Sequence, residues 1–275
     1  MHTIFATDPR LTWSGTISLE SDANSTNPWR IPYQDKDIYS PGVSELAGRA
    51  EMPSGVRVRF ATAATELTVV CEAFAEDGNF DLVIDNEIIA TTAFVAGDSE
   101  VRFADLPAGD KTLEIWLTPA MPVAMRHIAL PDGSDIAASE DTRLKWVTYG
   151  SSITHCRTAG SPATTWPGVA ARGQNLNLTS LGFGGQCHAD PLIARLIRDL
   201  PADFLSAKIG INIYGAASLS ARSFRPAVLG TIATIRDGHP DTPLAVCSPI
   251  WGHDRETTPN AIGLTLQQMR VEVQE

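Results

Sequence analysis

The sequence predicts an all-β sandwich followed by a three-layer α/β domain, and three features of the 275-residue chain support this order. Up to about residue 130, apolar residues recur at every second position, the period of a sheet with one covered face. A polar stretch rich in turn-forming residues, 131–141, then interrupts the pattern. Beyond it, apolar runs alternate with helix-like segments, as in a parallel sheet covered by helices. We therefore expect a β-sandwich accessory domain over 1–135 and an α/β domain over 143–275.

The strands expected in the first domain are short, and Gly, Asp and Pro residues separate them. In the first clear example, Val56, Val58 and Phe60 alternate with Arg57 and Arg59. The same alternation recurs in four further runs, at 67–71, 80–84, 101–103 and 113–117. Short alternating strands of this kind are typical of a jelly-roll-like antiparallel sandwich.

Trp116 has two readings within the last of these strands. It falls on the face opposite Leu113, Ile115 and Leu117. An exposed tryptophan could stack on a sugar ring, whereas a buried one packs against the second domain or the other sheet. We favour packing.

The second domain contains four apolar runs expected to form strands, at 144–149, 175–181, 204–211 and 243–249. The clearest helix starts after Asp190, where an N-cap Asp and Pro191 precede apolar residues spaced three and four apart. A last helix-like segment covers 262–272. In open parallel sheets, ligands and chemistry collect where strands end and helices begin, so the residues after these strands are the functional candidates.

Charge and composition exclude several classes of protein. The formal net charge is −11, and residues 1–140 hold 22 of the 32 acidic side chains but 9 of the 21 basic ones. The negative electrostatic field of such a chain opposes binding to nucleic acid or to an anionic membrane. No apolar run is long enough for a membrane span and no signal peptide is evident, so we expect a cytoplasmic protein. The four cysteines form no CxxC pair, which favours scattered reduced thiols.

Three turns after the expected strands carry groups suited to acyl-transfer chemistry. The first is Tyr149-Gly150-Ser151-Ser152, the second is Gly182-Phe183-Gly184-Gly185, and the third is Gly210-Ile211-Asn212. A serine at a helix start can act as a nucleophile or merely cap the helix. A glycine-rich turn can present a backbone N–H to an anion, and an asparagine amide can donate to a developing oxyanion or satisfy loop backbone. Each signal is weak by itself.

Together, in order and spacing, the three turns resemble the blocks of the SGNH (GDSL) hydrolase superfamily over residues 144 to about 250. The resemblance implies a flavodoxin-like three-layer fold, with Ser152 as nucleophile. It also implies an oxyanion hole made by the N–H groups of Ser152 and Gly185 and the side-chain amide of Asn212. SGNH enzymes with a preceding sandwich are similar to carbohydrate esterases or to polyketide-tailoring acyltransferases. Two positions depart from the usual pattern: Ser151 replaces an Asp, and Ile213 stands where an Asp often follows the asparagine.

The catalytic base is the missing part of this resemblance. The family supplies His and Asp from a C-terminal Asp-x-x-His-Pro block, which this sequence lacks. Asp237-Gly238-His239-Pro240 has one residue too few and precedes the fourth strand, so we interpret it as a loop. His155, His188 and His253 follow strands and are weaker candidates. Because the last segment is helix-like and ends without a breaker, we expect that a C-terminal segment carrying the base is missing from the chain.

We therefore expect a serine esterase that acts on the O-acyl ester of a small polar molecule, such as a sugar, through an acyl-Ser152 intermediate. Transfer of the acyl group to an alcohol acceptor is the enzymatic alternative. A non-catalytic carbohydrate-binding module, or degenerate hydrolase, is the alternative from another class. No cofactor is expected. No metal site is expected either, because His188 with Asp190 and His253 with Asp254 do not form a clustered ligand set.

Overall fold

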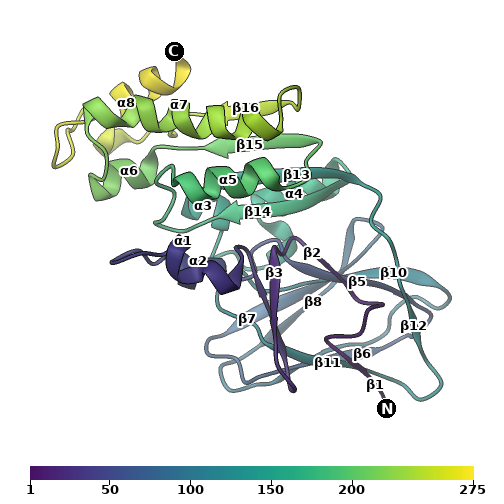
Figure 1. Cartoon of the computed structure of the whole chain (residues 1–275). Coiled ribbons are helices and arrows are strands. Elements are labelled where there is room, and N and C mark those ends of the chain that lie inside the picture. The colour runs from purple at the N-terminus through teal and green to yellow at the C-terminus, as the bar shows by residue number, and fades with distance from the viewer.

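The computed structural model describes residues 1–275 as an antiparallel β-sandwich joined to a helix-covered parallel sheet (Figure 1). The two predicted domain types are therefore confirmed. The N-terminus lies at the far end of the sandwich, and the C-terminus lies at the opposite end of the molecule.

The sandwich consists of two six-stranded sheets. One has the order β3-β4-β11-β6-β9, with β1 added against β11, and its strands are β1 (His2–Phe5), β3 (Ser18–Ser21), β4 (Thr26–Trp29), β6 (Leu67–Cys71), β9 (Glu100–Phe103) and β11 (Met125–Leu130). The other has the order β12-β5-β10-β7-β8, with β2 added against β5, and its strands are β2 (Thr12–Ser14), β5 (Arg57–Thr62), β7 (Gly78–Ile84), β8 (Glu87–Phe94), β10 (Lys111–Trp116) and β12 (Ile136–Ala137). β12 pairs with β5, so the polar stretch 131–141 contains a strand of this sheet.

The alternating residues of these strands form the sandwich core, as their period predicts. Val58, Phe60, Leu113 and Ile115 are fully buried within one cluster of 26 buried residues between the two sheets. Only short helices interrupt this part of the chain: η1 (Tyr33–Asp35), α1 (Lys36–Tyr39) and α2 (Leu46–Ala50).

The second domain contains a four-stranded parallel sheet in the order β14-β13-β15-β16. Its strands are β13 (Leu144–Gly150), β14 (Leu176–Gly182), β15 (Phe204–Lys208) and β16 (Leu244–Cys247). Its helices are α3 (Ser152–His155), η2 (Pro162–Thr164), α4 (Trp166–Gly173), α5 (Pro191–Asp199), α6 (Ile211–Ala216), α7 (Ala221–Gly238), η3 (His253–Arg255) and α8 (Leu266–Gln274).

Helices cover both faces of this sheet, which gives the three layers expected. On one face, Val147 and Leu205 share a cluster with residues of α5 and α7, among them Ile193 and Phe224. On the other face, Trp146 packs with Ala171 of α4 and with residues of the sandwich.

Two predicted boundaries in this domain are wrong. The third strand ends at Lys208 rather than at residue 211, and α6 begins at Ile211. Ile209 and Ile213 are both fully buried, and a short apolar run does not by itself distinguish a strand from a buried helix start. The last helix begins at Leu266 rather than near residue 262, because the Thr265 side chain and Gln268 form a capping box there.

The domains share apolar core. Trp29, Ile31 and Leu46, which precede β5, belong to the cluster that covers the parallel sheet. Trp116 is 1% exposed and packs with Trp146 and Leu178 of the second domain. Trp116 thus packs against the second domain, as favoured, and is not available to stack on a sugar ring.

Candidate active site

The three candidate turns lie at one edge of the parallel sheet. Gly150 of β13 pairs in register with Gly182 of β14, and each strand leads at its carboxyl end into one of these turns. α3 starts at Ser152, the turn of Gly184 and Gly185 follows β14, and α6 starts just before Asn212. This edge is where an open α/β sheet collects its ligands.

The two adjacent serines have different roles at the start of α3. Ser151 is fully buried, and its Oγ accepts a hydrogen bond from the N–H of Ile153 at 3.3 Å, so it is the helix cap. Ser152 is exposed, and its hydroxyl forms no hydrogen bond with another residue. As the first residue of a helix, it also has a backbone N–H without an intrahelical acceptor. Capping therefore occupies Ser151 and leaves both groups of Ser152 open to solvent.

The turn after β14 packs directly against α3. A β-carbon at Gly182 would lie 2.3 Å from the backbone nitrogen of His155, so only glycine allows this approach. A β-carbon at Gly184 would lie 3.7 Å from Cα and Cβ of Ser152. Gly185 has a φ of +77° and is exposed, and its backbone N–H donates to no backbone carbonyl.

Asn212 is held from the other side of the same turn. Its Oδ1 accepts a hydrogen bond from the N–H of Cys187 at 3.1 Å. This contact orients the amide and leaves the two N–H groups of Nδ2 without an intramolecular acceptor. The turn 184–187 thus lies beside Ser152 at one end and is hydrogen-bonded to Asn212 at the other.

His155 does not act as a base toward Ser152. It is fully buried, with Nε2 3.0 Å from the carbonyl oxygen of Pro119 and Nδ1 3.2 Å from the backbone nitrogen of Gly184. Burial, followed by the charge of Arg30, lowers the pKa of His155 to about 3. The imidazole therefore stays neutral at physiological pH.

The other two candidate histidines take different positions. His188 Nε2 lies 2.9 Å from the carbonyl oxygen of Gly185, and its Nδ1 lies 2.8 Å from Ser218 Oγ. His253 lines a cavity of about 300 Å³, which Ile153 and Ile211 also line. None of the six histidines hydrogen-bonds to Ser152.

His239 belongs to the structure rather than to the site, as expected from its spacing. It is the C-cap of α7, and its Nε2 lies 3.0 Å from the carbonyl oxygen of Ile197. Asp190 lies at the N-cap of α5 as predicted, but its side chain forms no cap bond. Instead, its Oδ2 accepts a hydrogen bond from the N–H of His188.

The cavity of about 300 Å³ has an apolar side and a polar side, the latter formed by His253, Asp254 and Arg255. Ile153 and Ile211, the residues next to Ser152 and Asn212 in the chain, line it together with Ile250 and Trp251. The Trp251 side chain is 62% exposed and Ile250 is 53% exposed. An apolar group of a bound substrate would cover both side chains.

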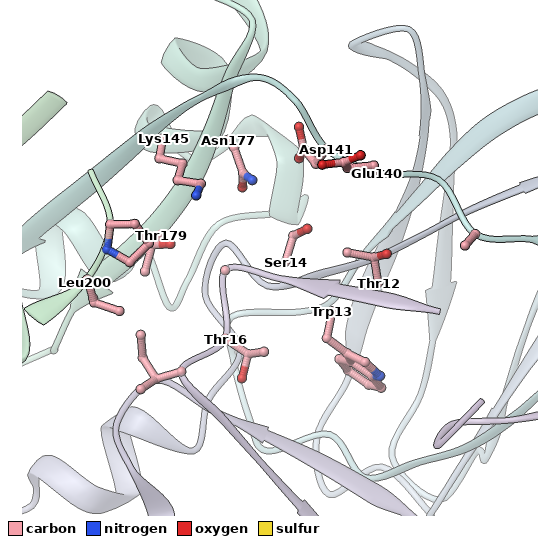
Figure 2. Close-up of a pocket in the computed structure, with 14 residues that line it drawn as sticks. Thr12, Trp13, Ser14, Thr16, Glu140, Asp141, Lys145, Asn177, Thr179 and Leu200 are labelled. Atoms are coloured by element: carbon pink, nitrogen blue, oxygen red, sulfur yellow. The ribbon is translucent and has the colours of Figure 1, made fainter. Parts of the chain in front are cut away.

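A larger cavity, of about 500 Å³, lies at the other end of the parallel strands, at the junction of the domains. Figure 2 shows Lys145 and Asn177 facing Ser14 and Thr16 across it, with Glu140 and Asp141 at its upper rim. Lys145 is the second residue of β13, whereas Ser152 follows the last residue of that strand. Size therefore does not identify the site here.

Arg30 is a site component that sequence reasoning missed. It is fully buried, and its guanidinium donates to the carbonyl oxygens of Ser180 at 3.0 Å, Gly182 at 2.6 Å and Met52 at 2.6 Å, and also to that of Arg49. It also lies over the ring of Phe183, 5.0 Å from the centroid. No carboxylate pairs with it, and burial lowers its pKa to about 9. A single arginine in the run Pro28-Trp29-Arg30-Ile31 gave no signal of these contacts.

The site contains an open serine hydroxyl, unpaired N–H donors and a neighbouring cavity with an apolar side, which is the equipment of an acyl-transfer enzyme. The comparisons agree with this class. A model of the SsfX3 N-terminal domain matches residues 11–125, and a model of the GDSL-like lipase/acylhydrolase family matches residues 144–270. The chain belongs to the GDSL-like lipase/acylhydrolase family, in the two-domain SGNH group. It is an SGNH-type enzyme, an ester hydrolase or acyltransferase.

Among solved structures, the chain is similar to the salicylyl-acyltransferase SsfX3 from a tetracycline biosynthetic pathway, with 32% identity and a TM-score of 0.91 over 99% of this chain and 79% of that one. The family two carbohydrate esterase from Clostridium thermocellum shares the fold at 16% identity and a TM-score of 0.66, over 96% of this chain and 82% of that one. The family two carbohydrate esterase from Cellvibrio japonicus shares it at 16% identity and a TM-score of 0.63, over 92% and 80%. No curated protein matches the sequence significantly.

Two further observations bear on the sequence-based expectations. All four cysteines are unpaired, as expected. No helix combines the length and the apolar character needed to cross a bilayer.

Proposed function

We propose that the protein is a serine esterase in which Ser152 is the nucleophile and three N–H donors bind the oxyanion. The donors are the backbone N–H groups of Ser152 and Gly185 and the Nδ2 group of Asn212. The observation that carries the proposal is the turn 184–187, which contacts Ser152 through Gly184 and Asn212 through Cys187.

The reaction follows from this geometry. Ser152 Oγ attacks the ester carbonyl carbon, and the carbonyl oxygen gains negative charge that the N–H donors stabilise. The proton of the Ser152 hydroxyl passes to an imidazole and from there to the alcohol oxygen, as the bond from carbon to that oxygen breaks and the alcohol leaves. Water attacks the acyl-serine and releases the acid. Each preorganised donor of this kind is worth about 2.7–4 kcal/mol in the transition state.

The cavity that Ile153 and Ile211 line, next in the chain to Ser152 and Asn212, supports a proposal for the acyl group. Its Ile153, Ile211, Ile250 and Trp251 side chains suit an apolar acyl chain or ring, and its volume of about 300 Å³ is at the small end for ligand sites. We propose a small apolar or aromatic acyl group on a polar alcohol, such as a sugar. The cytoplasm remains our proposed compartment.

A rescue experiment tests the nucleophile and the donors together. A serine hydroxyl needs an imidazole to accept its proton, and no histidine hydrogen-bonds to Ser152. We expect added imidazole to accelerate cleavage of p-nitrophenyl esters by this chain. The matched Ser152→Ala variant should show only the background reaction with imidazole. Equal rates for the two proteins at every imidazole concentration would contradict the proposal.

Acyl transfer is the second candidate, favoured by the 32% identity to an acyltransferase along 99% of this chain. The same acyl-serine would then pass its acyl group to an alcohol rather than to water. Product analysis with and without an acceptor alcohol separates the two. A new ester at the expense of free acid indicates transfer, and free acid alone indicates hydrolysis.

A further inference from the structure

His155 is the last residue of α3, and its side chain is fully buried. Three hydrogen bonds join this residue to parts of the chain outside α3. Its carbonyl oxygen accepts from the Ser54 hydroxyl at 2.7 Å, its Nε2 meets the carbonyl oxygen of Pro119 at 3.0 Å, and its Nδ1 meets the backbone nitrogen of Gly184 at 3.2 Å. Ser54 and Pro119 both precede the second domain in the chain, so His155 joins that part of the protein to the turn after β14.

The partners of the ring fix its protonation. A carbonyl oxygen can only accept, so Nε2 must carry the hydrogen that Pro119 receives. A backbone N–H can only donate, so Nδ1 must be bare to accept from Gly184. Protonation of the ring would place an N–H at Nδ1 that faces the N–H of Gly184, and the hydrogen bond between them would be lost. The lowered pKa of His155, about 3, agrees with this single neutral tautomer.

The bond from Gly184 matters because it holds the turn at the residue before Gly185. Two successive glycines have wide conformational freedom, and Gly185 lies at a positive φ of +77°. Within the turn, the N–H of Gln186 donates to the carbonyl oxygen of Phe183 at 3.0 Å. The hydrogen bond to His155 is the contact that fixes the N–H of Gly184, the residue before Gly185.

Other contacts fasten the same turn from the first part of the chain. Arg30 donates to the carbonyl oxygen of Gly182 at 2.6 Å, where the turn begins. Gln186 Oε1 accepts from the Ser44 hydroxyl at 3.3 Å and from the N–H of Glu45 at 3.2 Å, where the turn ends. His155 supplies the attachment between these two points.

We propose that His155 is a positioning residue. Its Nδ1 accepts a hydrogen bond from the N–H of Gly184, and this bond sets the direction of the next N–H in the chain, that of Gly185. This inference rests on the proposed role of Gly185 in the oxyanion hole. His155 itself touches no reacting atom. In this account the sandwich side of the protein helps to shape the oxyanion hole through Pro119, Arg30 and Ser44.

Two amide variants, each of which replaces one ring nitrogen by a polar atom, separate this role from simple support of the fold. In His155→Asn, the side-chain oxygen takes the place of Nδ1 and can still accept from Gly184, but the bond to Pro119 is lost. In His155→Gln, the side-chain nitrogen takes the place of Nε2 and can still donate to Pro119, but the acceptor for Gly184 is lost. Both variants remove one buried hydrogen bond, so both should lose similar amounts of stability.

The proposal predicts different activities for the matched pair. With imidazole present, His155→Gln should lower kcat roughly 10-fold to 100-fold at unchanged KM, the range expected when an oxyanion donor is misplaced. His155→Asn should keep kcat within about threefold of the unmodified chain. Equal kcat values for the two variants, or losses that simply follow their stabilities, would overturn the proposal.

Amide hydrogen exchange at Gly184 provides a readout that needs no turnover. We expect exchange to be at least about tenfold faster in His155→Gln than in His155→Asn, because only the first loses the acceptor. Equal exchange would overturn the inference. If exchange differs as expected while Ser152→Ala cleaves esters as fast as the unmodified chain, the proposed function fails and the link between His155 and the turn stands.

Discussion

At the scale of single residues, neighbours of the same type in the sequence have different contacts and roles. Ser151 caps a helix whereas Ser152 is open, and Gly182 permits close packing whereas Gly185 presents its N–H. Asn212 shows the same division within one side chain, since Oδ1 is used by Cys187 and Nδ2 is free. Its two halves can therefore be tested separately.

Asn212→Ala removes both halves, and we expect it to retain the fold and to lower kcat about a hundredfold or more. Asn212→Asp keeps an acceptor for the Cys187 N–H but provides no donor and adds negative charge beside the oxyanion. It should be at least as slow as the alanine variant. Steady-state kinetics with imidazole and a thermal melt check both points. Normal turnover in Asn212→Asp would exclude an N–H donor role for this residue.

At the scale of elements, the short helix α3 connects Ser152, the proposed nucleophile, to the rest of the protein through the buried ring of His155. The neutral ring makes the stability of this connection depend on pH. The pKa of His155 is lowered to about 3 in the folded protein, whereas an exposed histidine has a pKa near ~6.5. At a pH below ~6.5, His155 therefore binds a proton in the unfolded chain but not in the folded one.

We expect the free energy of unfolding to fall as the pH is lowered from about 6.5 toward 3, by up to about 1.4 kcal/mol per pH unit from this group. The His155→Asn variant is the control, because other titrating groups, including His127 with its own lowered pKa, remain in both proteins. Urea unfolding at pH 7, 6 and 5 measures the difference. Parallel stability curves for the two proteins would contradict the assigned neutral state.

The sequence predicted the elements well where their periodicity is strong. Val58 and Phe60 in the sandwich, and the helix after Asp190, lie where the pattern places them. The end of β15 was not predicted, because buried Ile209 and Ile213 belong to one core whether the backbone is strand or helix. The three candidate turns lie at the carboxyl ends of neighbouring strands, as expected from the order of the strands.

At the scale of the whole molecule, the contacts that hold the site come from both domains and were not predictable from local patterns. Arg30 lies 150 residues from Ser180 in sequence and donates to its carbonyl oxygen. His155 likewise looked like a candidate at the edge of the pocket, and only its contacts with Pro119 and Gly184 define its role. Long-range pairs of this kind leave no periodic signal in a single sequence.

This sharing of core and hydrogen bonds predicts that the two domains unfold together. Arg30→Met would remove a donor from four carbonyl oxygens, of which only that of Met52 has another named donor, the N–H of Ser54, and we expect a loss of at least about 3 kcal/mol. Arg126→Met is the matched control, because Arg126 forms an exposed ion pair with Glu72, and exposed pairs contribute little to stability. Denaturant unfolding should show one transition for both variants. Two separate transitions, or equal stabilities, would contradict the shared structure.

The most direct test of the central claim is covalent labelling of the nucleophile. A fluorophosphonate forms a bond from serine oxygen to phosphorus, releases fluoride and leaves a negatively polarised oxygen in the oxyanion hole. With imidazole present, we predict one adduct per chain, located by peptide mass spectrometry at Ser152. The adduct should be retained in Ser151→Ala and absent in Ser152→Ala, with much slower labelling in Asn212→Ala. An unlabelled chain, or an adduct at another residue, would contradict the account and favour a non-catalytic binding module.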